Sequence, residues 1–592
     1  MVSAKTAFDE ANRLRRAGDI TGAIASMRVA LQLDPSHDTW WSNYGVLLYQ
    51  NGDLREAASA LGEATRRNPR LSGAQTNLAR IWRELGDDVA AKAALSAAIA
   101  IDSSNAVAHA GLGNIAQAAG DYSGALAHYD KVPGAQPAPA GVLANMLHCM
   151  QRLAEWDGFD AAWEMLAQAL SVLPEASAPP FMLLSLPATI RQLLPAAKAY
   201  TREVASTRWT AQWRWRDETP GRRLRVGYAN ANFHEHPVAR LLAPVIEQHD
   251  PERIELFAYA YGTRSRDAIS DRLRRAVPGW RDMHDCNDRT FAQRIADDGI
   301  DVLIDLNGHT MGARPRVFAA RPAPVQISYL GFLGTCGAPY HDYLLTDTIA
   351  TPTSMQSAFS ERFLYLPASF VPRCWPGPPM IPMTRNEYHL PEQAFVYCAI
   401  NSSYKILPGR FLLWLNILRT VPDSVLWLLG EGTVREHFCS EAARHGVDPS
   451  RLVFTGAEAY DRYRARFALA DLFLDTTPYN AVTTAIDALS AGLPVLTQIG
   501  DTMIARSAAS ILHATACADM VATGDEHYFD LAVTLARDRP RLVALRRRIA
   551  EATTDGAANA KAHARALETA YALAWAETGR PRLALLQAGT AI

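Results

Sequence analysis

The feature that most constrains this sequence is a period of 34 residues in its first third. Gly-Asp pairs recur with this step at Gly18-Asp19, Gly52-Asp53, Gly86-Asp87 and Gly120-Asp121. Alanine and proline recur with the same step, at Ala23, Ala57, Ala91 and Ala125 and at Pro35, Pro69 and Pro137. Small residues let two helices pack closely, Gly-Asp turns the chain between them, and proline ends the second helix. The period therefore predicts a stack of helical hairpins.

These positions resemble the tetratricopeptide repeat family over residues 4–137, and a degraded fifth copy is expected over 155–170. The resemblance implies an α-helical superhelix over residues 1–170, with a concave groove that binds a peptide or another protein. A scaffold that only dimerises is the simpler alternative. A homo-oligomer is also compatible with the sequence.

Charge and cysteine usage exclude several classes of protein. With 59 Lys+Arg against 61 Asp+Glu, the chain lacks the basic surplus that binds nucleic acid or anionic lipid. No run of about 18 apolar residues occurs, and charges occupy the start where a signal peptide needs an apolar core. The seven scattered cysteines form no CxxC pair and no Cys/His spacing that suits zinc. We therefore expect a cytoplasmic protein with reduced thiols, no metal and no membrane partner.

The remainder of the chain reads as α/β structure after a connector. Prolines and a Trp-rich stretch, 209–215, predict a packed helical connector over 171–220. Beyond it, short β-branched runs alternate with amphipathic helices, which is typical of parallel sheets wound with helices. Expected strands lie at 224–231, 254–262, 300–308, 324–332 and 342–347, and then at 395–401, 424–430, 451–456, 471–476 and 493–500.

A proline-dense crossing, 367–391, separates the two sets of strands. We therefore expect two Rossmann-like lobes, 221–385 and 386–592, with ligands at the carboxyl ends of their strands. The first strand is followed by ANANFHEHP rather than GxGxxG, and no Walker loop occurs. This argues against dehydrogenases and phosphate-loop enzymes and leaves a two-lobed transferase.

The segment 475–497, DTTPYNAVTTAIDALSAGLPVLT, is the most informative motif. An expected strand ends at Asp475, a Pro/Asn turn follows, and Thr483 and Thr484 open a helix. The free N–H groups and the positive dipole end of such a helix form a site for a diphosphate. Simple N-capping by threonine accounts for one of these residues, but not for the whole strand-turn-helix arrangement. The segment therefore favours a diphosphate site made without metal.

This segment is similar to the CNGHTT…D motif of the O-linked N-acetylglucosamine transferase and SPINDLY family, glycosyltransferase family 41. Residues 307–347 resemble the family's NGYTKGAR…RPAPIQ…GYPGTSGA…DY..TD run, 397–408 resemble its FNQLYKI segment, and 232–242 resemble its DFxxHP loop. The resemblance covers about residues 220–590 and identifies the chain as a bacterial-type member. It implies a GT-B catalytic region, with the acceptor lobe first and the donor lobe second.

The resemblance also implies roles for individual residues on the donor side. Lys405 matches the catalytic lysine, whose ammonium neutralises charge on the departing diphosphate. Ser402 occupies a donor contact where the family often has glutamine. Arg466 matches an arginine near the nucleobase, and Asp487 matches a donor-binding aspartate that reaches the ribose.

On the acceptor side, the resemblance places His236 near the acceptor hydroxyl. An imidazole there can act as a base or only orient the substrate, and His234 is close enough in sequence to confuse the assignment. Gly334 and Thr335 belong to a loop whose backbone can approach the sugar or phosphate closely.

One departure from the family pattern affects the donor. The family's HTT triplet is Val482-Thr483-Thr484 here. The expected reaction is inverting, metal-independent transfer from a UDP-sugar co-substrate, without a cofactor, to Ser or Thr of a protein. Alternatives are a flagellin glycosyltransferase that uses a nonulosonic acid carried on CMP, N-linked glucosylation of asparagine, and a repeat scaffold whose catalytic lobes have decayed.

Overall fold

The computed structural model describes residues 3–132, 139–173, 175–206, 209–212, 222–377 and 381–578. The chain divides into two compact units, residues 1–149 and 150–592. Three features used above lie outside the described residues: Pro137, the end of the Trp-rich stretch from residue 213 onward, and the expected start of the first lobe at residue 221.

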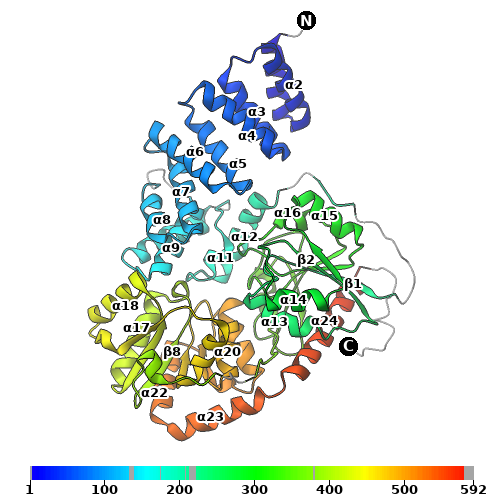
Figure 1. Ribbon diagram of the computed structural model, residues 1–592. Coiled ribbons are helices and arrows are strands. Elements are labelled where there is room, and N and C mark those ends of the chain that lie inside the picture. The colour runs from blue at the N-terminus through cyan, green and yellow to red at the C-terminus, as the bar shows by residue number, and fades with distance from the viewer. Residues whose placement is uncertain are drawn as a thin grey trace. The chain divides into compact units, whose positions relative to one another are not determined.

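The first unit contains the helical hairpins that the 34-residue period predicts (Figure 1). Its paired helices are α1 (Ala4–Arg16) and α2 (Ile20–Leu33), α3 (Asp38–Asn51) and α4 (Leu54–Arg67), α5 (Ser72–Glu84) and α6 (Asp88–Ile101), and α7 (Ala106–Ala118) and α8 (Tyr122–Tyr129). Gly18, Gly52, Gly86 and Gly120 have φ between +81° and +93°, the left-handed conformation that glycine adopts at low cost. The alanines of the repeat are fully buried where the helices of a hairpin meet.

The degraded copy expected over 155–170 coincides with helix α10 (Phe159–Val172), which follows α9 (Ala140–Leu153) in the chain. Gly158, directly before α10, has a φ of +80°, as the turn glycines of the repeat do. The spacing from Gly120 differs from 34 residues, so the period alone does not reveal this turn.

The connector places helix α12 (Ile190–Val204) against the first lobe. After the short helix α11 (Pro180–Leu183), a capping box of Thr189 and Gln192 begins α12. A Cβ on Gly337 would lie 2.5 Å from the backbone nitrogen of Lys198, so glycine permits a close approach between this helix and a loop of the lobe. The hydroxyl of Thr201 donates to the carbonyl of Cys336 at 2.7 Å.

The first lobe is a seven-stranded parallel sheet with the strand order β3-β2-β1-β4-β5-β6-β7. The strands are β1 (Leu224–Asn230), β2 (Ile254–Ala260), β3 (Gly279–Asp282), β4 (Val302–Asp305), β5 (Val325–Ser328), β6 (Tyr343–Thr346) and β7 (Arg362–Tyr365). Its crossover helices are α13 (Pro237–Ile246), α14 (Ala268–Ala276), α15 (Asp288–Asp297) and α16 (Pro315–Ala319). The strand order reverses between β1 and β4, as in doubly wound folds.

The second lobe is a six-stranded parallel sheet with the order β10-β9-β8-β11-β12-β13. Its strands are β8 (Phe395–Ala399), β9 (Ser424–Leu429), β10 (Leu452–Thr455), β11 (Leu472–Leu474), β12 (Val495–Gln498) and β13 (Val521–Ala522). Its main helices are α17 (Pro408–Thr420), α18 (Gly432–Arg444), α19 (Tyr460–Ala465), α20 (Thr483–Ser490), α21 (Ser507–His513) and α22 (Asp525–Arg537). The predicted fold class, a helical repeat followed by two Rossmann-like lobes, is confirmed.

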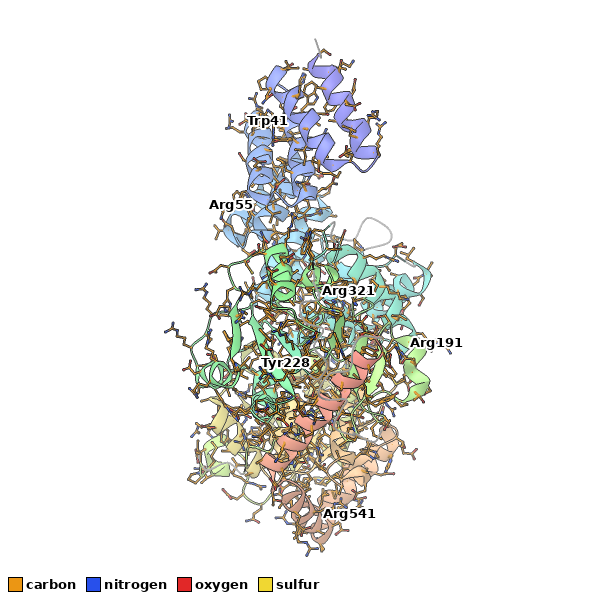
Figure 2. All side chains as sticks on the ribbon, turned by 90° about the vertical axis from the view of Figure 1, so that its right-hand side faces the viewer. Trp41, Arg55, Arg191, Tyr228, Arg321 and Arg541 are labelled. Atoms are coloured by element: carbon orange, nitrogen blue, oxygen red, sulfur yellow. The ribbon has the colours of Figure 1, made fainter. Side chains whose placement is uncertain are left out.

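Two more helices lead the chain from the second lobe back to the first. Helix α23 (Arg539–Ala552) runs along the second lobe, and α24 (Gly556–Ala576) packs on the first, where Tyr571 bonds Tyr228 at 2.8 Å (Figures 1 and 2). Among the described residues, no helix is both long enough and apolar enough to cross a bilayer.

Candidate nucleotide-sugar site

The carboxyl ends of β8 and β11, the adjacent central strands of the second lobe, carry the main charged groups of the candidate site. Lys405 ends a short helical turn, Ser403–Lys405, just beyond β8. Asp475 directly follows β11 and is buried. Its carboxylate accepts hydrogen bonds from the backbone of Thr476 and Ala481, at 2.8 and 2.7 Å, and from Thr497 Oγ1 at 2.6 Å. These bonds fix the turn that leads into helix α20.

Burial disfavours the charged form of both groups. The half-buried Lys405 ammonium lies 4.7 Å from the centre of the Tyr479 ring. Burial lowers the pKa of Lys405 to about 8, and the nearby Asp475 opposes this shift. Burial likewise raises the pKa of Asp475 to about 6. An anion that binds next to Lys405 interacts favourably with the ammonium. This interaction offsets the free-energy cost of burying the charge, so the site favours anion binding.

The N-terminus of α20 offers free donors next to this turn. No side chain caps the helix at Val482, and the first intrahelical bond runs from the N–H of Ile486 to the Val482 carbonyl. The N–H groups of Thr483, Thr484 and Ala485 therefore have no partner within the helix. The two threonine side chains are half-buried. This arrangement is suited to binding a phosphate group.

Asp487 lies one turn further along α20 and is held from two sides. Its carboxylate accepts from the Tyr460 hydroxyl at 2.8 Å and lies 4.0 Å from Arg464 Nε. Burial raises its pKa to about 6. The Arg240 guanidinium of α13 stacks on the Tyr460 ring at 3.5 Å, so the two lobes meet beside this carboxylate.

His236 is the N-cap of α13 in the first lobe. Its Nδ1 accepts the backbone N–H of Val238 at 3.3 Å, and its ring lies 5.8 Å from that of His234. Burial lowers the pKa of His236 to about 4, and the neighbouring His234 and Arg240 add to the shift. The ring is therefore neutral at physiological pH. Because Nδ1 accepts a bond, Nε2 carries the proton and is a donor.

The remaining expected residues occupy more enclosed positions. Arg466 is buried, donates to the Gly456 carbonyl at 3.0 Å and stacks on Tyr463 at the carboxyl end of β10. Ser402 is half-buried three residues before Lys405, to which its carbonyl is bonded.

Gly334 and Thr335 are buried within the first lobe. The Thr335 hydroxyl donates to Glu361 at 2.7 Å and accepts from the N–H of Gly337 at 3.1 Å. Of the expected residues, Ser402, Lys405, Thr483, Thr484 and Asp487 thus lie around the carboxyl edge of one sheet. Gly334, Thr335 and His236 belong to the other lobe.

Comparison with known proteins shows the family of this chain. The model of glycosyl transferase family 41 matches residues 177–372 and 377–567, and a tetratricopeptide repeat model matches residues 14–81. The chain belongs to glycosyl transferase family 41. The resemblance inferred from the motifs is thereby confirmed.

This family 41 chain is similar to proteins from several kingdoms. It is 36% identical over 332 residues to the probable UDP-N-acetylglucosamine–peptide N-acetylglucosaminyltransferase SEC of Arabidopsis thaliana, covering 55% of this chain and 34% of that protein. It is 28% identical to the UDP-N-acetylglucosamine–peptide N-acetylglucosaminyltransferase of Caenorhabditis elegans, covering 56% and 39%. The chain thus spans little more than a third of the length of these curated relatives.

A solved structure matches along the whole of this family 41 chain. It is a mutant of the O-GlcNAc transferase of Thermobaculum terrenum, with a TM-score of 0.65 and 25% identity. The match covers 99% of this chain and 98% of that one. The order of a helical repeat followed by two α/β lobes is therefore shared from end to end.

Sequence reasoning missed two buried polar residues near the candidate site of this family 41 chain. Asn401, which follows β8, is 2% exposed, and neither atom of its amide has a hydrogen-bond partner. Arg410, in the first turn of α17, is 4% exposed, and its Nε and Nη1 are unpaired, although Nη2 donates to Gln498 at 2.7 Å. Unpaired buried polar atoms are uncommon and indicate a missing partner. The signal available in the sequence was an asparagine directly after an apolar strand.

Proposed function

We propose that this chain transfers a sugar from a nucleotide-sugar donor to serine or threonine hydroxyls of a protein. The proposal rests on two features at the same edge of the sheet. One is the Lys405 ammonium, whose charged form is disfavoured by burial, and the other is the uncapped N-terminus of α20. Both features stabilise a diphosphate leaving group, one as a full charge and the other as aligned N–H donors. Family membership supports this assignment.

The proposed reaction is a single inverting displacement at the anomeric carbon, without metal or cofactor. The acceptor oxygen forms a bond to this carbon as the bond to the diphosphate breaks, and Lys405 with Thr483 and Thr484 takes up the charge on the leaving group. His236 orients the acceptor by donating from Nε2, since its Nδ1 is engaged at the helix N-terminus. The acceptor proton then passes to another base or to water.

The other expected residues complete the donor side of this proposal. Asp487, fixed by Tyr460, binds the ribose, and Arg466 supports the wall of the base pocket. Ser402 contacts the diphosphate, while Gly334 and Thr335 shape the loop that faces the sugar.

A UDP-sugar is the proposed donor, because the names of the Arabidopsis and Caenorhabditis relatives specify UDP-N-acetylglucosamine. The replacement of the family's histidine by Val482 is the reason to test a second class of donor. It places an apolar, half-buried side chain at the start of α20, where the family motif has histidine. A nonulosonic acid on CMP, with flagellin as acceptor, is therefore the second candidate.

The repeat array is proposed to hold the protein acceptor in the cytoplasm. The division of labour follows the expected segments: residues 1–170 bind the acceptor, 171–220 connect, 221–385 present the acceptor hydroxyl and 386–592 bind the donor. The matching tetratricopeptide model supports the first of these assignments.

Intact-mass spectrometry tests the proposal. The full chain is incubated with UDP-N-acetylglucosamine, other UDP-sugars or a CMP-linked nonulosonic acid, together with candidate acceptors that include flagellin and a cell lysate. We expect one donor to add its sugar mass to a protein, and Lys405→Ala to slow the addition about 10²–10³-fold. If no donor yields a glycosylated protein, the transfer function is rejected and the decayed scaffold is the remaining interpretation.

A further inference from the structure

Three potential metal ligands from separate parts of the first lobe meet in its interior. Cys336 lies in the loop after β5, His341 precedes β6, and Glu361 precedes β7. All three side chains are buried, and one ligand atom from each lies within 4.8 Å of the others. The spacing of these residues along the chain matches no familiar zinc motif, so only the fold brings them together.

His341 is the least satisfied member of this cluster. The residue is 4% exposed, and neither ring nitrogen makes a hydrogen bond of acceptable geometry, although Nε2 lies 3.1 Å from Asp305 Oδ2. A buried polar atom without a partner costs about 1–3 kcal/mol. An imidazole enclosed by a thiol and two carboxylates therefore has both the position and the unused lone pair of a metal ligand.

Two buried carboxylates in and beside the cluster also favour the binding of a cation. Glu361 is buried, and each of its oxygens accepts one bond, from the Cys336 N–H and from the Thr335 hydroxyl, both at 2.7 Å. Asp305 is a second buried carboxylate. Buried carboxylates are ordinarily paired or bound to metal.

We propose that Cys336, His341 and Glu361 bind a thiophilic divalent cation, with Zn²⁺ the best match, and that Asp305 holds the imidazole through Nε2. Mixed sulfur, nitrogen and oxygen ligands suit zinc, and a carboxylate behind a histidine ligand is a common supporting contact. Zinc bond lengths put ligand atoms roughly 3.3–3.8 Å apart, so the side chains close slightly around the ion. Because the thiolate is the form that binds a metal ion, binding releases the Cys336 proton to solvent.

The cation has a structural role in this proposal. It ties the Gly334–Gly337 loop to the segments that lead into β6 and β7 and takes no part in sugar transfer. The metal site is therefore independent of the proposed function. It is tested by measuring metal content and not by measuring transferase activity.

Metal analysis of the full chain, purified without a histidine tag, tests the site. We expect one zinc per chain and, after Co²⁺ substitution, a near-ultraviolet absorption band from thiolate-to-cobalt charge transfer. Cys336→Ser should abolish the band, and Asp305→Asn should weaken Zn²⁺ binding about 10–100-fold, as loss of a supporting carboxylate does. Cys517→Ser, at another buried free cysteine, is the matched control and should keep both signals.

A wild-type chain that neither retains zinc nor develops the cobalt band overturns the proposal. The same conclusion follows if Cys336→Ser binds the metal as tightly as the wild type. If the variants do not fold, the cobalt spectrum of the wild-type chain decides, because a thiolate ligand is required for the band.

Discussion

At the scale of single residues, the candidate site is built from charges that burial disfavours. The pKa of Lys405 is lowered to about 8 and that of Asp475 is raised to about 6, both chiefly by burial. At neutral pH both groups are still mainly charged, so the folded chain tolerates an unfavourable arrangement. In the proposed function, a bound diphosphate relieves it on the lysine side, which converts a cost of folding into selectivity for an anion.

The pH dependence of transfer is the first prediction. The proposed role needs the protonated ammonium, so kcat/KM should fall as the pH rises through about 8, the pKa of Lys405 in the free protein. Lys405→Arg should remove this alkaline limb, because a guanidinium keeps its proton, and Lys405→Ala should lower kcat/KM about 10²–10³-fold. An unchanged alkaline limb in Lys405→Arg would assign it to another group.

His236 gives a second prediction at this scale. Because its Nδ1 accepts a backbone bond, we expect the imidazole to donate to the acceptor rather than take its proton. Asparagine can both cap the helix and donate, so His236→Asn should retain more activity than His236→Ala. Steady-state kinetics at several pH values measure the difference. Equal loss of activity in both variants would instead support the histidine as general base.

At the scale of helices and strands, the hairpins depend on small residues at fixed positions. A Cβ on Gly45 of α3 would lie 2.6 Å from Leu61 Cγ and 3.2 Å from the Ala57 carbonyl on α4. Leu61 is fully buried, so a shift of its side chain also displaces the residues packed around it.

Substitution of Gly45 by alanine should therefore destabilise the repeat unit by about 1–3 kcal/mol, as overpacking of a tight interface does. Gly62 of α4 is the matched control, because a Cβ there meets nothing within 4 Å. Gly62→Ala should stabilise by about 0.5–1 kcal/mol through helix propensity. Urea unfolding followed by circular dichroism compares the two variants, and a neutral Gly45→Ala would contradict the packing described here.

The elements that the sequence predicts are those with strong local patterns. The repeat helices follow from the 34-residue period, and each of the ten expected strands has a counterpart in the sheets. The edge strands β3, β7 and β13 were not predicted. Two of the four residues of β3 are charged, and β13 has only two residues, so neither forms a continuous apolar run. The apolar run of β7 begins directly after the charged residues Glu361 and Arg362 and was missed.

The residues of the candidate site and of the metal cluster also fall into two groups, those that the sequence predicts and those that only the fold reveals. Lys405, Thr483 and Thr484 lie in contiguous motifs and could be named from the sequence. The unpaired state of Asn401 and the meeting of His341 with Glu361 depend on which side chains the fold encloses. Contacts between segments that are distant in the chain produce no periodicity or spacing in the sequence from which they could be predicted.

At the scale of the molecule, α24, which follows the second lobe in the chain, is anchored on the first lobe through buried polar contacts. Glu568 is fully buried, where it accepts from the N–H of Asp250 at 2.9 Å and from Arg565 and contacts His249 Nδ1 at 3.1 Å. Although burial raises its pKa, these bonds lower it below the usual value. The stability that Glu568 contributes is therefore present above its unfolded pKa of about 4.5 and lost as the pH falls through the folded value.

Removal of this carboxylate is the whole-molecule prediction. Glu568→Ala should cost about 3–5 kcal/mol at pH 7, because it leaves buried partners uncompensated. Glu577, which follows the same helix, pairs with Arg362 while its side chain is 47% exposed, so Glu577→Ala should cost about 1 kcal/mol or less. Denaturant midpoints give the comparison. Similar losses in both variants would show that α24 is not anchored through Glu568.

The position of α24 also sets an order of events during synthesis. Tyr228 and its partner Tyr571 are 343 residues apart, and ribosomes add about 5–20 residues per second. The nascent first lobe must therefore wait on the order of tens of seconds before this helix can cover it. During that interval the face around Tyr228 and His249 is open to solvent and to other chains, so chaperones that shield apolar surfaces should bind the first lobe before the second is complete.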